Sequence, residues 1–282
     1  RHAGFQAIPG LTGESMIECL VDGEISDRIS ASDRGLQFGD GLFETIAVIG
    51  GQPRFWQLHM DRLGAGCERL GIPATPQPVL LREVKTVCAG QSQCIVRIIV
   101  TRGESERTYS TAGLAQAHRV VSAHAWQPEE PDPGVFGVRA RLCNLRLGIQ
   151  PDLAGMNHLN RLEQVLARAE WDDPLIDEGI LLDREDHVIC GVSSNIFLVY
   201  AGRLLTPRLD RCGIRGVMRA AILGAFRERC EQRRLLLDML PDAEEVFICN
   251  SVRGAIPLTR IGHWEYEIGP VTREVREWLK QQ

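Results

Sequence analysis

The stretch LAGMNHLNRLEQ, residues 153–164, decides how the fold of this chain is read. A proline and two small residues precede its asparagine, Asn157. Apolar residues then recur at helical spacing: Leu159, Leu162, Val165, Leu166 and Ala169. This periodicity predicts an amphipathic core helix, and it places Asn157 where an irregular segment turns into that helix.

The composition excludes several classes of protein. The chain has 282 residues, of which 44% are hydrophobic and 24% charged, and its formal net charge is −5. These values are typical of a globular protein with one large domain or two compact ones. The lack of a basic stripe argues against nucleic-acid binding. No apolar run approaches the roughly 20 residues that span a bilayer, so we expect no membrane segment.

Cysteine and lysine usage adds two constraints. Nine cysteines are scattered singly without a Cys-x-x-Cys pair, which predicts free thiols in a reducing compartment and hence a cytoplasmic protein. No His, Cys or Asp cluster has metal-ligand spacing, so we expect no metal. Only two lysines occur, Lys85 and Lys280, so a cofactor that attaches to lysine has few alternative positions.

Turn and linker signals divide the chain into two parts. Residues 127–134 contain three prolines and three carboxylates, which predicts a linker between an N-terminal domain, 16–126, and a C-terminal domain, 135–282. Residues 1–15 show neither periodicity nor an apolar signal segment, and we expect them to be an added leader outside the fold.

Apolar periodicity and breaker residues predict the individual elements. Two hairpins are expected, the first turned by Asp22-Gly23 and the second by residues 50–52. Besides the central helix, helices are predicted at 55–70, 78–88, from about 214 to about 230, and at 274–281. Further strands are predicted at 94–101, 118–124, 135–142, 177–183, 188–199 and 244–250.

The central string also carries a resemblance. It resembles the aminodeoxychorismate lyases of the fold-type IV pyridoxal phosphate enzymes, a group that includes branched-chain and D-amino-acid aminotransferases. In those lyases a lysine stands where this chain has Asn157, and it forms the Schiff base with the cofactor and carries protons. An amide nitrogen is not a nucleophile, so the chain lacks the group that this motif presents.

The N-terminal half contains two further matching motifs. Residues 33–46, DRGLQFGDGLFETI, resemble the N-terminal signature of the group, which implies that Thr45 lies beside the cofactor and assists the elimination. Residues 59–63, HMDRL, match a His-x-x-Arg-Leu pattern, which implies that Arg62 holds the cofactor phosphate. Taken alone, a helical arginine is usually a solvated charge.

The cofactor-ring position departs from the group. Residues 188–199 resemble a strand-loop-strand motif that ends in Asn-x-Phe, in which a glutamate five residues before the asparagine bonds the pyridine nitrogen. Counting back from Asn195 gives Cys190. A thiol with an ordinary pKa of about 8.5 is mostly neutral at pH 7 and is a poor partner for a pyridinium.

Two segments resemble the phosphate contacts of the group. Glycines precede the predicted helix near residue 214, and free amides at a helix N-terminus bind anions. The resemblance implies the amides of Ile214 and Arg215 there. It also implies a second contact at Asn250 and Ser251, with the hydroxyl of Ser251 as donor.

Substrate contacts are expected on the loop after residue 101. The relatives show Arg-Gly-x-Gly-x-Arg-Gly-Tyr where this chain has RGESERTY. The match makes Arg102, Arg107 and Tyr109 candidates for the substrate carboxylates, although an exposed loop of mixed charges would look the same. Arg146 also resembles a position near the active site.

The resemblance covers residues 16–277 and implies the rest of the prediction. The fold is a two-domain α/β (α+β) fold of type IV, with a smaller N-terminal α/β domain and a larger barrel-like C-terminal domain, normally in a homodimer. The activity is conversion of 4-amino-4-deoxychorismate, a small-molecule substrate, to 4-aminobenzoate and pyruvate with pyridoxal 5'-phosphate, in folate synthesis. The alternatives are a branched-chain or D-amino-acid aminotransferase, or a homologue that Asn157 has made inactive.

Overall fold

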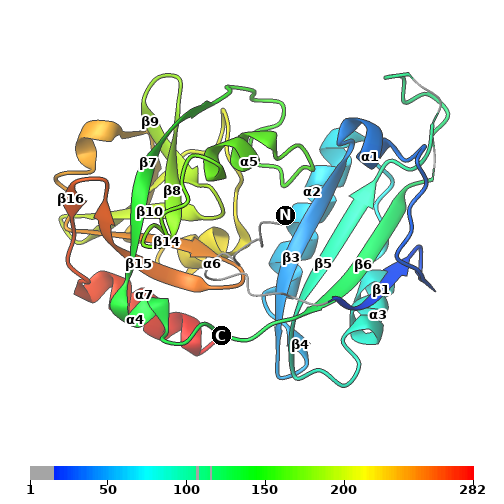
Figure 1. Ribbon diagram of the computed structural model, residues 1–282, viewed down its shortest axis with the longest axis horizontal. Coiled ribbons are helices and arrows are strands. Elements are labelled where there is room, and N and C mark those ends of the chain that lie inside the picture. The colour runs from blue at the N-terminus through cyan, green and yellow to red at the C-terminus, as the bar shows by residue number, and fades with distance from the viewer. Residues whose placement is uncertain (1–15, 106–107, 115) are drawn as a thin grey trace, which may run out of the picture.

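The computed structural model describes residues 16–105, 108–114 and 116–282, and it contains two sheets (Figure 1). The first sheet has the strand order β2-β1-β6-β5-β3-β4, and every neighbouring pair is antiparallel. Its strands are β1 (Met16–Val21), β2 (Glu24–Ile25), β3 (Gly41–Ile49), β4 (Gln52–Pro53), β5 (Gln93–Thr101) and β6 (His118–Ala125).

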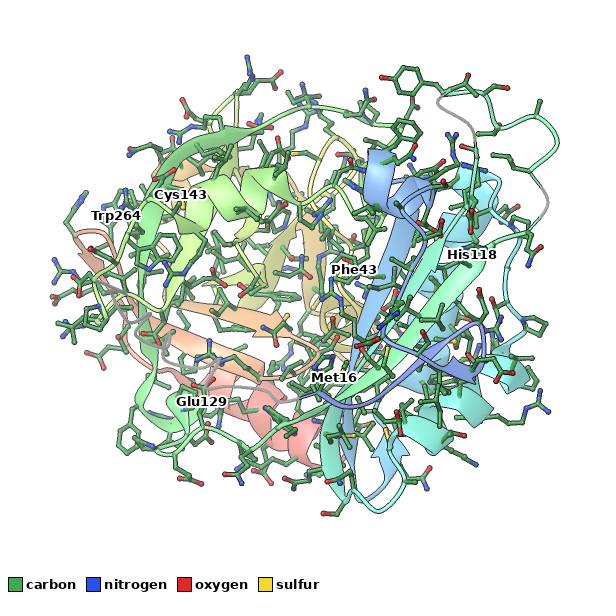
Figure 2. All side chains as sticks on the ribbon, turned by 45° about the vertical axis from the view of Figure 1, so that its right-hand side comes forward. Met16, Phe43, His118, Glu129, Cys143 and Trp264 are labelled. Atoms are coloured by element: carbon green, nitrogen blue, oxygen red, sulfur yellow. The ribbon has the colours of Figure 1, made fainter. Side chains whose placement is uncertain are left out.

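Three helices accompany the first sheet: α1 (Arg34–Phe38), α2 (Trp56–Leu70) and α3 (Gln77–Val87). Side chains alternate along β3, so Leu42 and Ile46 join the core together with Met60 and Leu63 of α2. Phe43 and Thr45 lie on the other face of β3 and do not belong to this core. Figure 2 shows Phe43 on the side of this sheet that faces the second half of the molecule.

The second sheet is larger and mixed. Its path is β12-β11-β10-β14-β15-β7-β8-β9-β13, with β16 paired to β15. Its strands are β7 (Val138–Leu147), β8 (Glu178–Asp183), β9 (His187–Gly191), β10 (Asn195–Tyr200), β11 (Arg203–Pro207), β12 (Cys230–Arg233), β13 (Leu235–Leu236), β14 (Glu245–Asn250), β15 (Gly254–Ile261) and β16 (Trp264–Glu265). Because β9 also contacts β10 and β11, the sheet curls toward a barrel.

The second sheet is covered by α4 (Pro133–Phe136), α5 (Leu162–Arg168), α6 (Val217–Ala225), α7 (Pro270–Lys280) and the short 3-10 helix η1 (Leu237–Met239). Helices α6 and α7 pack on β14, where Phe197 and Phe247 stack with ring centroids 4.9 Å apart. In Figure 1 the two sheets lie side by side, with α5 and α6 between them. Among the described residues, no helix combines the length and the apolar character that crossing a membrane would take.

The observed elements confirm most of the predicted ones, and two differences matter. The strand predicted to start at Val135 begins at Val138, because Asp132 caps a short helix whose first residue is Pro133. The central helix starts only at Leu162, and its apolar face is not in the core.

The central helix turns its apolar side outward. Leu162, Val165 and Leu166 are 75%, 60% and 61% exposed, and only Ala167 is buried within α5. The prediction of a core helix at this place was therefore wrong, although the helical periodicity that supported it is real.

The domain boundary at 127–134 stays a prediction. The last strand of the first sheet ends at Ala125 and the first strand of the second begins at Val138, on either side of it. The expected leader, residues 1–15, lies outside the described residues.

Candidate functional site

One cavity of about 580 Å³ lies between the two domains. The first domain contributes Phe43 and Thr45 from β3 and Arg62 from α2 to its lining. The second domain contributes a larger share, which includes Asn157, Cys190, Asn195, Ile214, Asn250 and Ser251. The structure thus brings the predicted cofactor residues to one place, except for Arg215.

Arg62 is held at this cavity by a buried carboxylate. Its Nε donates to Glu44 Oε1 at 2.9 Å and its Nη2 to Glu44 Oε2 at 2.5 Å. Burial disfavours the charged form of Glu44, but Arg62 and His59 outweigh burial and lower the pKa of this carboxyl. Since Glu44 occupies that edge of the guanidinium, Arg62 has mainly Nη1 left for an anion, and Nη1 lies 3.3 Å from the carbonyl oxygen of Arg215.

The α6 N-terminus supplies backbone donors to the cavity. Val217 and Met218, its first two residues, line the cavity, and within the described residues their N–H groups donate to no acceptor. Asn195 fixes the loop before them, because its Nδ2 donates to the Ile214 carbonyl at 2.8 Å and its Oδ1 accepts from Gly216 N–H at 3.1 Å.

The geometry departs from the sequence prediction at Arg215. Its N–H already donates to the Gly155 carbonyl at 3.1 Å, and Arg215 does not line the cavity. The helix begins at Val217, two residues after Arg215, and Val217 and Met218 add free amides at its N-terminus. The Ile214 N–H also donates to no acceptor among the described residues. Ile214 does line the cavity, as expected.

Asn250 and Ser251 have different roles in the turn between β14 and β15. Asn250 Oδ1 accepts from the N–H groups of Val252 and Arg253 at 3.1 and 2.8 Å, so Asn250 shapes the turn. Ser251 lines the same cavity as Arg62, Ile214 and the start of α6. A cationic side chain, a hydroxyl and free helix amides are groups that can bind an anion.

Asn157 stands on the cavity wall and is tied to β3. Its side-chain Nδ2 donates to the main-chain carbonyl of Phe43 at 2.5 Å. Its main-chain carbonyl accepts from the N–H of Phe43 at 2.9 Å. The side chain is neutral and 7% exposed. Lys85 and Lys280 are both exposed on helices and do not line the cavity, so the cavity contains no lysine.

Cys190 also lines the cavity and is buried. Burial raises the pKa of its thiol well above the ordinary range, and neighbouring Cys212 adds to the effect. Cys190 is therefore a neutral thiol at physiological pH. The nearest buried carboxylate, Glu178, is fully used: it accepts from Val192 N–H at 3.0 Å and from the hydroxyls of Ser193 and Ser194 at 2.9 and 2.8 Å.

These observations test the fit of pyridoxal phosphate. A phosphate suits this lining, because the lining includes Arg62, Ser251 and the first two residues of α6, whose amides are free. Covalent attachment does not fit, because the wall presents the amide of Asn157 and no amine.

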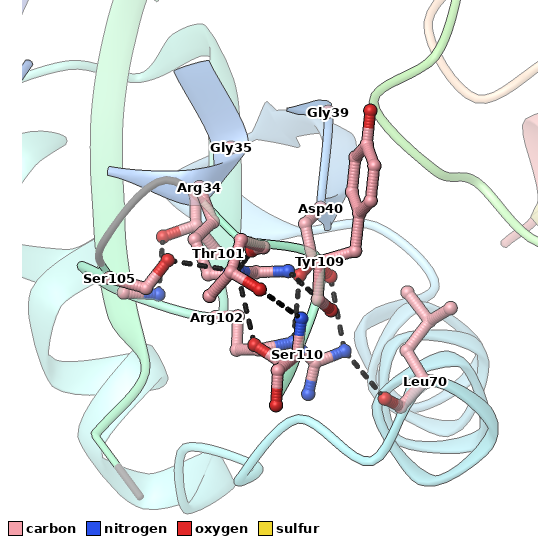
Figure 3. Close-up of polar contacts among 12 residues, drawn as sticks. Arg34, Gly35, Gly39, Asp40, Leu70, Thr101, Arg102, Ser105, Tyr109 and Ser110 are labelled. Atoms are coloured by element: carbon pink, nitrogen blue, oxygen red, sulfur yellow. Dashed lines mark hydrogen bonds and ion pairs between the residues drawn. The ribbon is translucent and has the colours of Figure 1, made fainter. Parts of the chain in front are cut away.

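Three of the four predicted substrate residues, Arg102, Tyr109 and Arg146, do not line the cavity. Arg102 is buried and donates to both oxygens of Asp40 and to the carbonyls of Leu70 and Gly71 (Figure 3). Arg146 donates to Asp186 and to backbone carbonyls. Tyr109 is 85% exposed, and Arg107 lies outside the described residues. Within one chain, Arg102 is thus a structural residue.

Three arginines in the cavity were missed by the sequence reasoning. Arg97 is the cross-strand partner of Thr45, and its Cζ lies 4.4 Å from the centre of the Phe43 ring. Arg161 directly precedes α5 and Arg168 is its last residue, and both also line the cavity. No motif marked them, since an isolated arginine in a strand or helix resembles a solvated charge.

One group of possible metal ligands occurs in the described part of the chain: Asp183, Glu185 and His187, on the turn after β8. Glu185 is paired with Arg211, and Asp183 Oδ1 accepts from the backbone N–H groups of Glu185 and His187. These atoms already have partners, and the group lies outside the cavity.

With this two-domain fold and cavity, the chain belongs to the amino-transferase class IV family, whose model matches residues 41–261. This confirms the family resemblance and the fold class read from the motifs. An aminodeoxychorismate lyase from Vibrio harveyi is 34% identical over 91% of this chain and 97% of its own length. A solved 4-amino-4-deoxychorismate lyase from Pseudomonas aeruginosa is 41% identical, covers 94% of this chain and 98% of its own, and superposes with a TM-score of 0.89. A D-alanine aminotransferase from Bacillus licheniformis is 25% identical over 94% of this chain and 96% of its own length.

Proposed function

We propose that the cavity is the active site of a 4-amino-4-deoxychorismate lyase, which releases 4-aminobenzoate and pyruvate and serves folate synthesis. The single observation that carries the proposal is the likeness to two lyases at 34% and 41% identity over nearly the whole chain. Thr45 lines the same cavity as Asn157, which supports the proposal. Aminotransferases of the family match at lower identity, so amino-group transfer is the second candidate.

The cofactor in this proposal is pyridoxal 5'-phosphate, which supplies an electron sink next to the reacting carbon when bound. Arg62, Ser251 and the amides of Val217 and Met218 hold its phosphate. The hydroxyl of Thr45 faces the cavity and is the donor for the departing enolpyruvyl oxygen. Cys190, as a neutral thiol, does not supply the negative charge that would keep a neighbouring ring nitrogen protonated.

Asn157 limits the chemistry that this site can perform. An amide cannot carry a proton away from carbon near neutral pH, and it cannot hold the cofactor covalently. His158 does not replace it: burial and then Arg161 lower the pKa of its imidazole to about 4, and His158 does not line the cavity. In this proposal the chain binds the cofactor noncovalently, and fast turnover requires an amine at position 157.

The test is the Asn157→Lys variant with added pyridoxal phosphate. Release of 4-aminobenzoate and pyruvate in equal amounts supports the lyase. Transfer of the amino group to 2-oxoglutarate in place of release would favour the aminotransferase. If Asn157→Lys binds the cofactor and catalyses neither reaction, the chain is a homologue that has lost catalysis, and the lyase proposal fails.

Homodimer formation and a cytoplasmic location complete the proposal. Leu162, Val165 and Leu166 give α5 an apolar surface next to the cavity, and such a patch on a monomer is a common mark of an interface. All nine cysteines are free thiols, which supports a reducing compartment.

A further inference from the structure

The cavity carries an excess of positive charge. Four arginines line it, and its lining includes no aspartate, glutamate or lysine. Arg62 is compensated by Glu44. Arg97, Arg161 and Arg168 have no carboxylate partner within the described residues. A cleft with uncompensated cations and low-dielectric walls attracts anions, so the cavity is built for a ligand with negative groups in addition to a phosphate.

Two of these cations share one face of α5. Arg161 precedes the helix and Arg168 ends it, and Gln164 and Val165 between them also line the cavity. The spacing of three, four and seven residues places all four side chains on one side of the helix. These residues come from a different element than Arg62, Ser251 and the start of α6, to which the phosphate is assigned.

Arg161 is held in place and has unused donor capacity. Its Nη2 lies 2.6 Å from His158 Nε2 and 3.0 Å from His158 Nδ1, and the neutral imidazole accepts from it. Its Nε is buried and has no partner among the described residues. Gln164 Oε1, one helical turn on, is likewise buried and unpaired. Buried polar groups without partners are costly, so an unpaired donor and an unpaired acceptor on two residues that line the cavity point to a ligand.

Arg168 adds the second charge. Its Nη1 donates to the Trp171 carbonyl at 2.7 Å and its Cζ lies 4.5 Å from the centre of the Trp171 ring. These contacts fix the direction of the side chain and leave its charge uncompensated. Guanidinium groups bind carboxylates and phosphates through paired N–H donors. Since the cofactor phosphate is assigned to Arg62, Ser251 and the start of α6, the two α5 arginines are available for a carboxylate.

We propose that Arg161 and Arg168 form a carboxylate-binding pair for the substrate, with Gln164 as an acceptor for a substrate donor group. This deepens the proposed function and rests on it, since it names the residues that bind a carboxylate of the proposed substrate. Arg161 and Arg168, and not Arg102 or Arg146, are then the residues that select a substrate with a carboxylate.

The experiment uses two probes that cannot condense with an aldehyde, 4-hydroxybenzoate and 4-hydroxybenzamide. Binding of each to the full chain saturated with pyridoxal phosphate is measured by calorimetry. We expect the carboxylate to bind at least about tenfold more tightly than the amide, since a charge-assisted hydrogen bond is worth more than a neutral one. Arg161→Gln should bring that ratio close to one, and Arg161→Lys should give an intermediate ratio because it keeps the charge without the fork.

Two further variants separate loss of the carboxylate contact from misfolding of the chain. Gln164→Glu places a negative charge beside Arg161 and should weaken 4-hydroxybenzoate binding while leaving 4-hydroxybenzamide binding unchanged. Arg211→Gln, which removes an equal charge at an ion pair outside the cavity, should leave the ratio at the value of the unmodified chain. An unchanged ratio in Arg161→Gln and Gln164→Glu overturns the proposal, as does loss of the ratio only in Arg97→Gln.

The outcome is separable from that of the lyase proposal, because probe binding needs no turnover. If Asn157→Lys releases no 4-aminobenzoate while the probe ratio responds to Arg161, the lyase proposal fails and the carboxylate site stands. If Asn157→Lys is active, adding Arg161→Gln should raise KM by about tenfold or more and change kcat less, since the lost contact is made in ground state and transition state alike.

Discussion

Asn157 Nδ2 donates to the carbonyl oxygen of Phe43 across the junction of the two domains, at 2.5 Å. Asn157, at the position that a lysine occupies in the related lyases, is therefore used as a tether between β3 and the 153–164 segment. Backbone bonds from Phe43 N–H to the Asn157 carbonyl and from Leu159 N–H to the Gly41 carbonyl join the same two segments.

The amide at position 157 predicts that the cofactor binds without a covalent bond to the chain. After incubation with pyridoxal phosphate and reduction with borohydride, peptide mass spectrometry should find no adduct on Asn157, because an amide forms no imine. Asn157→Lys should give a reduced adduct at that position. Asn157→Gln, which keeps an amide, is the matched control. An adduct on the Asn157 peptide of the unmodified chain would contradict the noncovalent site.

Phosphate binding should depend on Ser251. Replacing it with alanine removes a hydroxyl donor to a charged ligand, and we expect the Kd for pyridoxal phosphate to rise by about tenfold or more. Ser193→Ala, a hydroxyl that lines the same cavity but donates to Glu178, separates loss of the contact from general loosening of the loop. Equal effects of the two variants on Kd would remove Ser251 from the phosphate site.

Glu44 should control stability at low pH. Its folded pKa is lowered, so in the acid range the unfolded chain binds the proton more readily, and the Glu44 contribution is present above the unfolded pKa of about 4.3 and is lost as the pH falls through the folded pKa. Glu44→Gln should lower the free energy of unfolding at pH 7 by about 3 kcal/mol, because Arg62 and His59 lose a buried partner.

The check is urea unfolding of both proteins between about pH 7 and pH 3, the range in which carboxylates titrate. The difference between them should shrink as the pH falls below the unfolded pKa. Glu265→Gln, at an exposed strand end, should show no such convergence. A difference that stays constant with pH would mean that the charge of Glu44 does not contribute.

The sequence predicted the fold well because its signals were local. The turn at Asp22-Gly23, the helix ending at Gly71 and the buried strand of residues 93–101 each depend on neighbouring residues. Helical periodicity at 159–169 correctly indicated a helix with one apolar face. It could not say what covers that face, and among the residues that the structure describes nothing does.

The site was predicted only where a motif existed. Arg62, Thr45 and Ser251 line the cavity as the motifs implied. Arg215 was misassigned because its amide is used by Gly155, which is a long-range contact. Arg161 escaped notice because what distinguishes it is the lack of a carboxylate partner, and that depends on which elements fold around it.

The exposed face of α5 gives the last prediction. Leu162, Val165 and Leu166 are large, apolar and more than half exposed, and an interface with a second copy would bury them. Leu166→Asp should therefore shift the protein from dimer to monomer in sedimentation velocity, since an unpaired charge in an apolar interface is costly. Ile25→Asp, at a residue that is 75% exposed on the far edge strand β2, is the matched control and should leave the sedimentation coefficient unchanged. A monomeric unmodified chain, or a dimer that survives Leu166→Asp, would show that this face has another use. Because α5 also carries Arg161 and Arg168, loss of the dimer should weaken binding of 4-hydroxybenzoate as well, which links assembly to the cavity.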